Sequence, residues 1–546
     1  MTVLVEQQLL KGGAFLTNDC AVAETFTPED LTEEQRMIAE ATRRFVDKEV
    51  TPRIAQLEQH DWRLSRDLVR HAADLGLIGA RIPASYGGLG LDHISSALIA
   101  ENLGRCASFA TTCCAQTGIG LWPIIHFGTE TAKLNYLPRI ASGELITAYS
   151  LTEATSGSDA LAARATARLS ADGTHYILNG EKAFVTNGGL ADIFIVFAKI
   201  DGNKFTAFIV EAQEGVNRGV EERKMGIRGS STTSLVLTDA KVPRENLLGE
   251  AGMGHKIAFG ILSLGRCELG ATCVGAMKLM GEQATRYARE RKQFGRSISS
   301  FGAIRGKLAE MMVRTWVGES MVYRTLGLFE ASAGAIDSNN SEAWLREMDE
   351  YAAECSIVKV ALTEYCNYVA DEMVQIYGGY GFLADYPAER AYRDSRLKRI
   401  GEGTNEINRL LISSRLIKFA NRECQPLAED AGSPNPPSYE ETLLRRAKQA
   451  ALTSLRMAAQ MNKLTLAEQQ AIMIGIADII IDTYAMESAI LRTQKAGAAS
   501  SYVDMTQVFC ADASQRIEAN LKHTIAAIDG RGPVILRQRI AKASQL

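Results

Sequence analysis

The sequence predicts an α+β protein in which a region of β-hairpins separates two helical regions and a further helical module follows. Apolar residues recur at helical spacing over 27–147 and 251–425, whereas closely spaced Asp-Gly and Asn-Gly dipeptides mark 148–250. Helical spacing returns over 438–546, after a linker at 426–437 that is rich in Pro, Gly and small residues, and residues 1–26 form an N-terminal arm. At 546 residues the chain is long enough for several domains.

The composition is that of a soluble globular protein, with 46% hydrophobic and 23% charged residues. A net charge of −4 provides no global attraction for nucleic acid. The ten cysteines include no CxxC pair, which favours buried thiols in a reducing compartment, and the seven histidines lack the spacing of metal ligands. No signal peptide and no apolar stretch of about 20 residues is present, so we expect a cytoplasmic protein in a bacterium, or a mitochondrial matrix or inner-membrane protein in a eukaryote.

The C-terminal end is locally basic. Between Arg516 and Leu546 two acidic residues, Glu518 and Asp529, accompany six basic ones: Arg516, Lys522, Arg531, Arg537, Arg539 and Lys542. We interpret this end as a solvated helix face followed by a tail, which is the commoner meaning of such a run. Peripheral contact with an anionic membrane through the C-terminal module is the alternative.

The first helical region begins with a clear start signal. In LTEEQRMIAEATRRFVDKEV, Thr32 is placed to cap the helix and Gln35 to complete a capping box. The same stretch predicts one apolar face made of Leu31, Met37, Ile38, Ala41, Phe45 and Val46.

Three hairpins are predicted in the β region. The segments TARLS-ADG-THYIL, THYIL-NG-EKAFV and FIVFAKI-DG-NKFTAFIV each place an Asp-Gly or Asn-Gly turn between β-rich runs, because these dipeptides supply the positive φ angles of tight turns. A further strand, TSLVLTDAKV, precedes Pro243. The region is therefore expected to be an antiparallel meander or small barrel.

The usual nucleotide-binding motifs are missing. The stretch Gly302–Leu308 is one residue short of a P-loop, and no GxGxxG follows a strand in a βαβ context. Two other segments offer hydroxyl and aromatic groups to a ligand: AYSLTEATSGSDA (148–160) and AFVTNGG (183–189). Taken alone, the first is more often a Ser/Gly loop that turns the chain, and the second is more often a strand with one core aromatic.

Five motifs together make the chain resemble an acyl-CoA dehydrogenase over nearly its whole length. They are YSLTEATSGSD (149–159), EKAFVTNGGLAD (181–192), RERKQFG (289–295), VQIYGGYGF (374–382) and RIGEGTNEINR (399–409), in the family's order and spacing. The resemblance implies an N-terminal helical domain, a middle antiparallel β-barrel and a C-terminal helical bundle. The additional module after residue 437 is similar to that of the very-long-chain branch.

The resemblance implies an FAD site shared between two subunits. Phe184 would stack on the flavin where many members have Trp, and Thr186 would bond near its N5, while Arg291 and Phe294 would reach the FAD of a second subunit. The full set of implied FAD contacts is Tyr149, Leu151, Thr152, Gly157, Ser158, Phe184, Thr186, Arg291, Phe294, Gln375, Gly378, Gly379, Thr404 and Glu406. A homodimer is expected, with a tetramer as the alternative.

Glu402, between two glycines, matches the family's catalytic base. It would take the α-proton of an acyl-CoA thioester while a hydride leaves the β-carbon. Enclosure in an apolar cleft would raise its pKa toward the working pH. The resemblance places Ser158, Arg266, Gly403, Gln116 and Gly120 near the substrate. Some members carry the base at the position of Gly265 instead, and Glu268, three residues on, is expected to project from another face and to be structural.

The nature of the acyl group is open. Gly118 and Gly120 hint at a deep pocket, so we favour medium-to-long straight chains, with short branched or aromatic acyl groups as alternatives. The resemblance implies electron-transfer flavoprotein as the acceptor. Two other possibilities are a flavin-binding assembly or scaffold protein of the same fold and an acyl-CoA oxidase.

Overall fold

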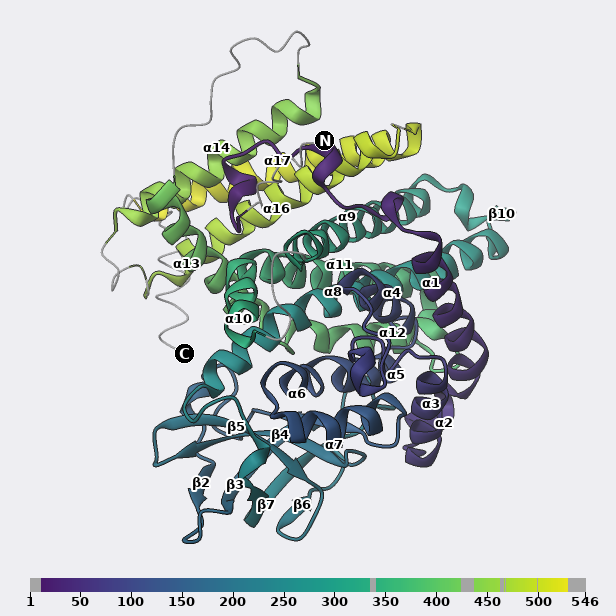
Figure 1. The fold of residues 1–546 in the computed structure, drawn as a ribbon. Coiled ribbons are helices and arrows are strands. Elements are labelled where there is room, and N and C mark those ends of the chain that lie inside the picture. Colours follow the sequence, from purple (N-terminus) through teal and green to yellow (C-terminus); the bar gives the residue numbers. More distant parts are fainter. Residues whose placement is uncertain are drawn as a thin grey trace, which may run out of the picture.

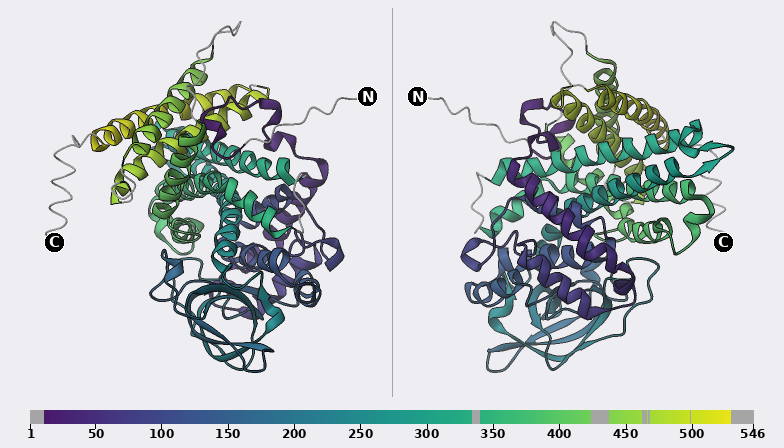
Figure 2. Two further views of the ribbon diagram at one scale, coloured as in Figure 1. Left: turned by 60° about the vertical axis from the view of Figure 1, so that its left-hand side comes forward. Right: turned by 90° about the vertical axis from the view of Figure 1, so that its right-hand side faces the viewer.

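The computed structural model describes residues 11–333, 340–423, 437–461, 466, 468–497 and 499–528. A β domain lies at one end of the molecule, a helical bundle in the middle and the C-terminal module at the other end (Figures 1 and 2). The predicted succession of helical, β, helical and helical regions is confirmed.

The elements have the following bounds. The N-terminal helices are α1 Glu33–Phe45, α2 Ile54–Glu58, α3 Trp62–Asp74, α4 His93–Leu103, α5 Ala107–Cys114, α6 Trp122–Phe127 and α7 Glu130–Ala141. The main sheet contains β1 Thr147–Ser150, β2 Thr166–Leu169, β3 His175–Thr186, β4 Ile193–Ile200, β5 Lys204–Glu211, β6 Val216–Arg218, β7 Thr232–Pro243 and β8 Leu247–Leu248. The bundle and its small arm contain α8 Gly254–Glu290, β9 Lys292–Gln293, β10 Arg296–Ser297, α9 Gly302–Ala333, α10 Ser341–Glu350, α11 Ala352–Tyr377, α12 Pro387–Arg396 and α13 Asn405–Glu423. The module contains α14 Tyr439–Ala459, α16 Gln470–Lys495 and α17 Ser500–Ile528.

Helix α1 begins where the sequence predicts. Thr32 Oγ1 accepts a hydrogen bond from Gln35 N at 3.2 Å, and Gln35 Oε1 accepts one from Thr32 N at 3.1 Å. The predicted apolar face is wrong at two positions, because Ala41 is exposed and Met37 is 65% exposed. Gln35 is buried instead, since its amide donates to Asp92 at the start of α4 and turns this face inward.

The sheet is mostly antiparallel, in the order β6-β7-β3-β2-β4-β5-β8. The predicted β2–β3 and β4–β5 hairpins are confirmed, with Leu169 opposite Tyr176 and Ile200 opposite Lys204. The purely antiparallel prediction is incomplete, because β4 pairs in parallel with β1 and with the start of β2.

The hairpin predicted at Asn179-Gly180 is wrong. β3 continues through this dipeptide and pairs with β7 on both sides of it, with a shift of register between Leu178 and Gly180. Gly180 has φ +146°, and a Cβ atom there would lie 2.7 Å from Ala165 Cβ. Gly180 therefore allows a β-bulge and the close approach of the segment that contains Ala165. It does not form a turn.

Helix α8 is the centre of the bundle and packs against α4, α9 and α11. Its approach to α11 is close, since a Cβ atom on Gly270 would lie 2.6 Å from Val358. Among the described helices, α8 alone is long and apolar enough to cross a membrane, but 83% of its apolar window is buried inside the molecule. Its apolar composition is therefore that of a core helix.

The C-terminal module docks on α9 and α13 through α16 and α14. The N-terminal segment also lies against the module (Figure 1). Phe15 packs edge-on against Tyr484, with ring centroids 4.9 Å apart. Most of the predicted linker and the basic residues after 528 lie outside the described residues.

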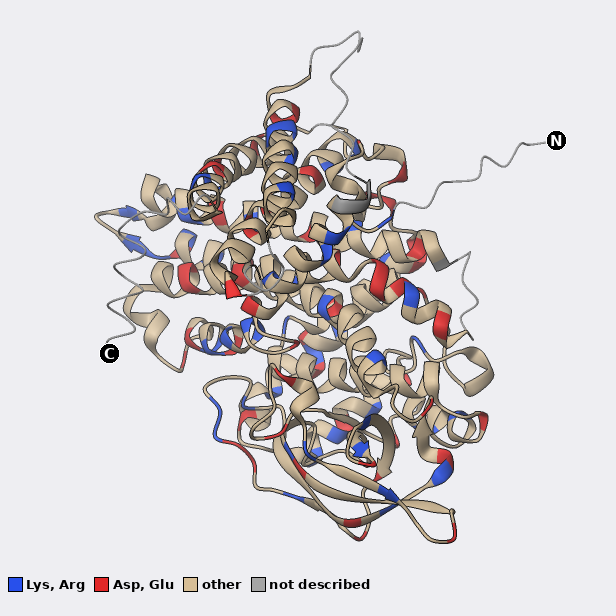
Figure 3. Cartoon of the chain, turned by 90° about the vertical axis from the view of Figure 1, so that its left-hand side faces the viewer, with Lys and Arg blue, Asp and Glu red and all other residues tan. Residues whose placement is uncertain are grey.

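Charge is mixed in sign along the chain, with Lys and Arg alternating with Asp and Glu over the helices (Figure 3). In the described part of the basic end, Arg516 pairs with Asp482 at 2.8 Å and Lys522 pairs with Glu518. These two basic residues are thus already neutralised within the module.

Candidate active site

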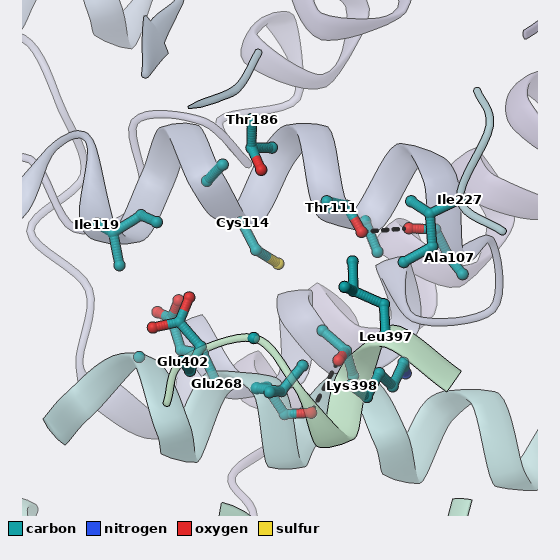
Figure 4. Close-up of a pocket in the computed structure, with 16 residues that line it drawn as sticks. Ala107, Thr111, Cys114, Ile119, Thr186, Ile227, Glu268, Leu397, Lys398 and Glu402 are labelled. Atoms are coloured by element: carbon teal, nitrogen blue, oxygen red, sulfur yellow. Dashed lines mark hydrogen bonds between the residues drawn. The ribbon is translucent and has the colours of Figure 1, made fainter. Parts of the chain in front are cut away.

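A cavity of about 170 Å³ lies between α5, α8 and the turn that carries Glu402 (Figure 4). One wall follows α5 into a single π-helical turn, η7 (Ala115–Ile119), and a second wall is the middle of α8. The third wall runs from the 3-10 turn η12 (Leu397–Arg399) to Glu402. Thr186, at the end of β3, lies across the cavity from Glu402. The cavity lining is Ala107, Ala110, Thr111, Cys114, Ala115, Ile119, Thr186, Ile227, Gly265, Glu268, Leu269, Thr272, Leu397, Lys398, Gly401 and Glu402.

The backbone at Glu402 is strained. Its φ of +56° lies in the left-handed region, which residues other than glycine rarely adopt, and Gly403 follows with φ +79°. Arg266 Nε donates to the carbonyl of Glu402 at 3.3 Å, and Lys359 Nζ donates to that of Gly403 at 2.7 Å. Asn408 Nδ2 also donates to Gly403 O at 2.8 Å. These donors hold a conformation that directs the Glu402 side chain into the cavity.

The Glu402 carboxyl group has the environment of a base. Its Oε2 atom is buried and has no hydrogen-bond partner. Burial raises the pKa of Glu402, while the positive charges of Arg266 and Lys359 oppose the rise. The α8 backbone passes close to the group at Gly265, where a Cβ atom would lie 3.5 Å from Oε2, an ordinary van der Waals contact. An unpaired carboxylate of raised pKa in a mostly apolar cavity can accept a proton from a weak carbon acid.

A second carboxyl group, Glu268, lines the same cavity beside Glu402 (Figure 4). The expectation that it projects from another face is wrong, because residues three apart on a helix share a face and Gly265 also lines the cavity. Its Oε1 accepts a hydrogen bond from Ser96 Oγ at 3.2 Å. Burial raises the pKa of Glu268 to about 8, and the charge of Glu402 adds to the rise. Glu268 is therefore mainly protonated at neutral pH.

Family models match most of the chain. The acyl-CoA dehydrogenase N-terminal domain matches residues 32–144, the middle domain 148–240, and the C-terminal domain 252–417. A second model described as an acyl-CoA dehydrogenase C-terminal domain matches 446–532. The chain belongs to the acyl-CoA dehydrogenase family.

Some relatives of this acyl-CoA dehydrogenase match nearly its full length, and others match a shorter part of the chain. A probable acyl-CoA dehydrogenase of Bacillus subtilis is 46% identical over 95% of this chain and 91% of the relative. The very long-chain specific enzyme of Rattus norvegicus is 39% identical over 64% of this chain and 53% of that protein. Among solved structures, an acyl-CoA dehydrogenase from Bacillus anthracis complexed with FAD has a TM-score of 0.91 at 46% identity, covering 98% of this chain and 95% of that chain.

The acyl-CoA dehydrogenase is FAD-dependent. The first group of predicted FAD residues lies in and beside the loop that follows β1. In the loop after β1, Ser158 is exposed and a Cβ atom on Gly157 would meet nothing within 4 Å. The carbonyl of Thr152 accepts a hydrogen bond from Ala183 N at 2.8 Å, which fastens the loop to β3. Leu151 is buried beneath the loop, and the hydroxyl of Tyr149 is buried without a partner.

A buried ion pair fixes this loop from below. Lys182 Nζ lies 2.7 Å from Glu153 Oε1, and both side chains are at most 7% exposed. Glu153 also accepts hydrogen bonds from the backbone N–H groups of Arg164 and Ala165. The loop thus presents its hydroxyl groups from a rigid support.

Phe184 and Thr186 lie together at the end of β3. Phe184 is 66% exposed and has φ +56°, which is strained for an aromatic residue. Thr186 lines the cavity that Glu402 also lines. An exposed aromatic ring beside a cavity hydroxyl suits a planar ring such as that of a flavin.

A second group of predicted FAD residues lies at the far end of the bundle. Phe294 is 93% exposed, and the Arg291 guanidinium lies 5.6 Å from the ring centroid of Tyr380, next to Gln375, Gly378 and Gly379. A Cβ atom on either glycine would meet nothing within 4 Å. Arg291 follows Arg266 by 25 residues (291 − 266) along α8, about 37 Å at about 1.5 Å per residue. Within a single protomer, the two groups of predicted FAD residues are therefore far apart.

Of the remaining predicted site residues, some lie next to Glu402 and others lie behind the cavity wall. Thr404 and Glu406 lie at the start of α13, directly after Glu402, and Glu406 is exposed. Gln116 and Gly120 are not in the cavity lining. The Gln116 amide donates to Leu145 O at 3.2 Å, and a Cβ atom on Gly120 would lie 2.2 Å from Thr147 Oγ1. Both therefore serve the packing of η7 on β1, behind the cavity wall.

Sequence reasoning missed several lining residues, notably Thr111, Leu397 and Lys398. Leu397 and Lys398 precede Glu402 in a stretch with no pattern that marks a pocket. They enter the cavity wall because the chain closes into the turn η12 before Glu402. Only the packing of this turn against α5 and α8 reveals them.

Proposed function

We propose that this acyl-CoA dehydrogenase oxidises a medium-to-long straight-chain acyl-CoA to the trans-2-enoyl-CoA. The observation that carries the proposal is the buried, unpartnered Oε2 of Glu402 facing a cavity that Thr186 closes on the other side. The cavity extends from Glu402 to Ala107 and Lys398, which suits an acyl chain more than a compact group (Figure 4).

In the proposed reaction the Glu402 carboxylate takes a proton from the α-carbon, and its Oε2 becomes protonated. Bound FAD would supply the acceptor for the hydride that leaves the β-carbon. Loss of a proton and a hydride leaves the carbon–carbon double bond, so atoms and electrons balance. The apolar walls keep water from the carboxylate, and Arg266 and Lys359 prevent its pKa from rising too far.

We further propose a homodimer that completes each FAD site. Phe184 and Thr186 lie at the end of β3, beside the cavity, whereas Arg291 and Phe294 lie in or next to the β9–β10 arm beyond the end of α8 (Figure 1). The exposed Phe294 and the open glycines beside it are available to a second copy. In the dimer, the β9–β10 arm of one protomer would contact the dinucleotide held by its partner.

The assignment of Glu402 as the base is tested by two separate substitutions in the same cavity, one at Glu402 and one at Glu268. Glu402→Gln should slow anaerobic reduction of the flavin by octanoyl-CoA or palmitoyl-CoA by about 10³-fold or more, because no carboxylate remains to accept the proton. Glu268→Gln should cost far less, since Glu268 is already mainly protonated at neutral pH. Loss of the flavin absorbance in a stopped-flow instrument measures both rates. Near wild-type reduction by Glu402→Gln would refute the assignment.

The electron acceptor is tested on the reduced protein. We propose that electrons pass to an electron-transfer flavoprotein, so that reoxidation is slow in air and fast when that protein is added. Rapid reoxidation by air would indicate an oxidase instead. Absence of any flavin bleaching across a panel of acyl-CoAs would indicate a flavin-binding scaffold.

A further inference from the structure

The end of the cavity away from Glu402 contains a buried lysine. Lys398 lies in η12, and its ammonium group points away from Glu402 (Figure 4). The residue is 7% exposed, and its Nζ atom is buried without an oxygen partner. A buried charge whose partner is a weak acceptor such as a thiol is unfavourable and is uncommon outside functional sites.

The other buried lysines of the described residues all have oxygen partners. Lys182 lies 2.7 Å from Glu153, Lys448 lies 2.6 Å from Glu487, and Lys359 donates to Gly403 O at 2.7 Å. Lys398 is the exception among these buried lysines. Within the described residues, no oxygen atom accepts a hydrogen bond from its three N–H groups.

The groups that face Lys398 supply a weak sulfur acceptor, the Cys273 thiol, but no oxygen. Its nearest titratable neighbours are the thiols of Cys273 and Cys366, with the Asp394 carboxyl beyond them. Asp394 Oδ1 already accepts a hydrogen bond from Ile227 N. Burial acts to lower the pKa of Lys398, but these neighbours outweigh it and raise the pKa overall, so the side chain remains cationic.

A smaller cavity of about 80 Å³ lies behind Lys398. It shares Ala107 and Lys398 with the first cavity. Its lining includes two further cations, Arg105 and Arg390, against one acid, Asp394. Arg105 already pairs with Asp47 at 3.3 Å and with Glu282 at 3.4 Å. Lys398 is therefore the buried cation at this end of the acyl cavity that lacks an oxygen partner.

We infer that Lys398 binds an anionic oxygen at the distal end of the acyl group, so that the preferred substrates are CoA thioesters of dicarboxylic acids. This inference rests on the proposed function, because it assumes that the thioester lies beside Glu402. A carboxylate at the chain end would pair with the ammonium as the protein's own carboxylates pair with Lys182 and Lys448. A methyl-terminated chain of equal length would displace water and leave the charge unpaired.

The wild-type holoenzyme tests the inference directly. Succinyl-, glutaryl-, adipyl- and suberyl-CoA are compared with butyryl-, valeryl-, hexanoyl- and octanoyl-CoA, which match them in carbon number. At the length that reaches Lys398, kcat/KM should favour the carboxylated thioester by about a hundredfold or more, because a site built for a polar group rejects an analogue that lacks it. Preference for the methyl-terminated thioester at every length would overturn the inference.

Lys398→Met tests the residue itself. Methionine keeps the length of the side chain and removes its charge, so kcat/KM should fall for the carboxylated thioester and rise for the methyl-terminated one. Lys204→Met, at an exposed turn lysine that pairs with Asp201, is the matched control and should leave the ratio unchanged. An unchanged ratio in Lys398→Met would refute the role of Lys398.

Binding is measured separately from turnover. In a Glu402→Gln background, which retains Lys398, calorimetric Kd values should be lower for the carboxylated thioester, and the added Lys398→Met change should remove the difference. Equal Kd values in the Glu402→Gln background would overturn the inference. If neither palmitoyl-CoA nor any of the eight thioesters reduces the flavin, the proposed function fails. If methyl-terminated thioesters reduce it as well as the carboxylated ones do, only this inference fails.

Discussion

At the scale of single residues, the strength of Glu402 as a base results from opposing effects. Burial raises its pKa, and the cations Arg266 and Lys359 lower it again. Both cations also hold the strained turn through its backbone carbonyls. The same two side chains therefore set both the direction and the basicity of the carboxyl group.

This balance predicts a shift in the pH profile. Lys359→Gln keeps a hydrogen-bond donor but removes the charge that favours the ionised form of Glu402, so the pKa of Glu402 rises further. Activity requires the carboxylate and increases as pH rises through this pKa, so the acid limb of kcat should move to higher pH. The pKa of Lys359 itself is lowered to about 8, so Lys359 is cationic over that limb. A limb that stays in place or moves to lower pH would contradict this account, and Lys204→Gln is the control.

At the scale of elements, tertiary contacts decide the conformation of Asn179-Gly180. The dipeptide has the composition of a hairpin turn, but β7 pairs with β3 on both sides of it. Gly180 then takes φ +146°, and Ala165 occupies the space where a side chain would lie. The long β3 that results carries Phe184 and Thr186 to the edge of the cavity.

Gly180→Ala should destabilise the protein by about 2–4 kcal/mol, because it combines backbone strain with a clash against Ala165. Gly202→Ala is the matched control: Gly202 also has positive φ, but a Cβ atom there would meet nothing within 4 Å. It should cost about 1 kcal/mol from strain alone. Urea denaturation of both variants measures the difference, and equal losses would show that the close approach is unimportant.

At the scale of the whole molecule, buried charges join the C-terminal module to the bundle. Glu487 of α16 lies 2.6 Å from both Arg324 of α9 and Lys448 of α14. Nearby, Arg492 pairs with Glu319 at 2.7 Å, and its guanidinium lies 3.7 Å from the ring centroid of Trp316. The module is thus fastened by groups that are stable in the interior only as pairs.

Glu487→Ala should therefore reduce the free energy of unfolding by about 3–5 kcal/mol, because it leaves Arg324 and Lys448 buried without their carboxylate. Glu518→Ala removes an exposed partner of Lys522 and should leave the free energy of unfolding nearly unchanged. Thermal and denaturant unfolding, followed by circular dichroism, measure both. Similar stabilities for the two variants would show that the buried network does not hold the module.

The sequence by itself determined the order of helical and β regions, the cap of α1, two of the three hairpins and the position of Glu402 between glycines. These features depend on residues close together in the chain, whose periodicity and turn chemistry act locally. Only the tertiary structure placed Glu268 beside Glu402 and Lys398 at the far end of their cavity, and continued β3 through Gly180 by way of a β-bulge. Glu268 and Glu402 stand 134 positions apart (402 − 268). They share a cavity because α8 packs against the turn that carries Glu402, and no local sequence pattern encodes that packing.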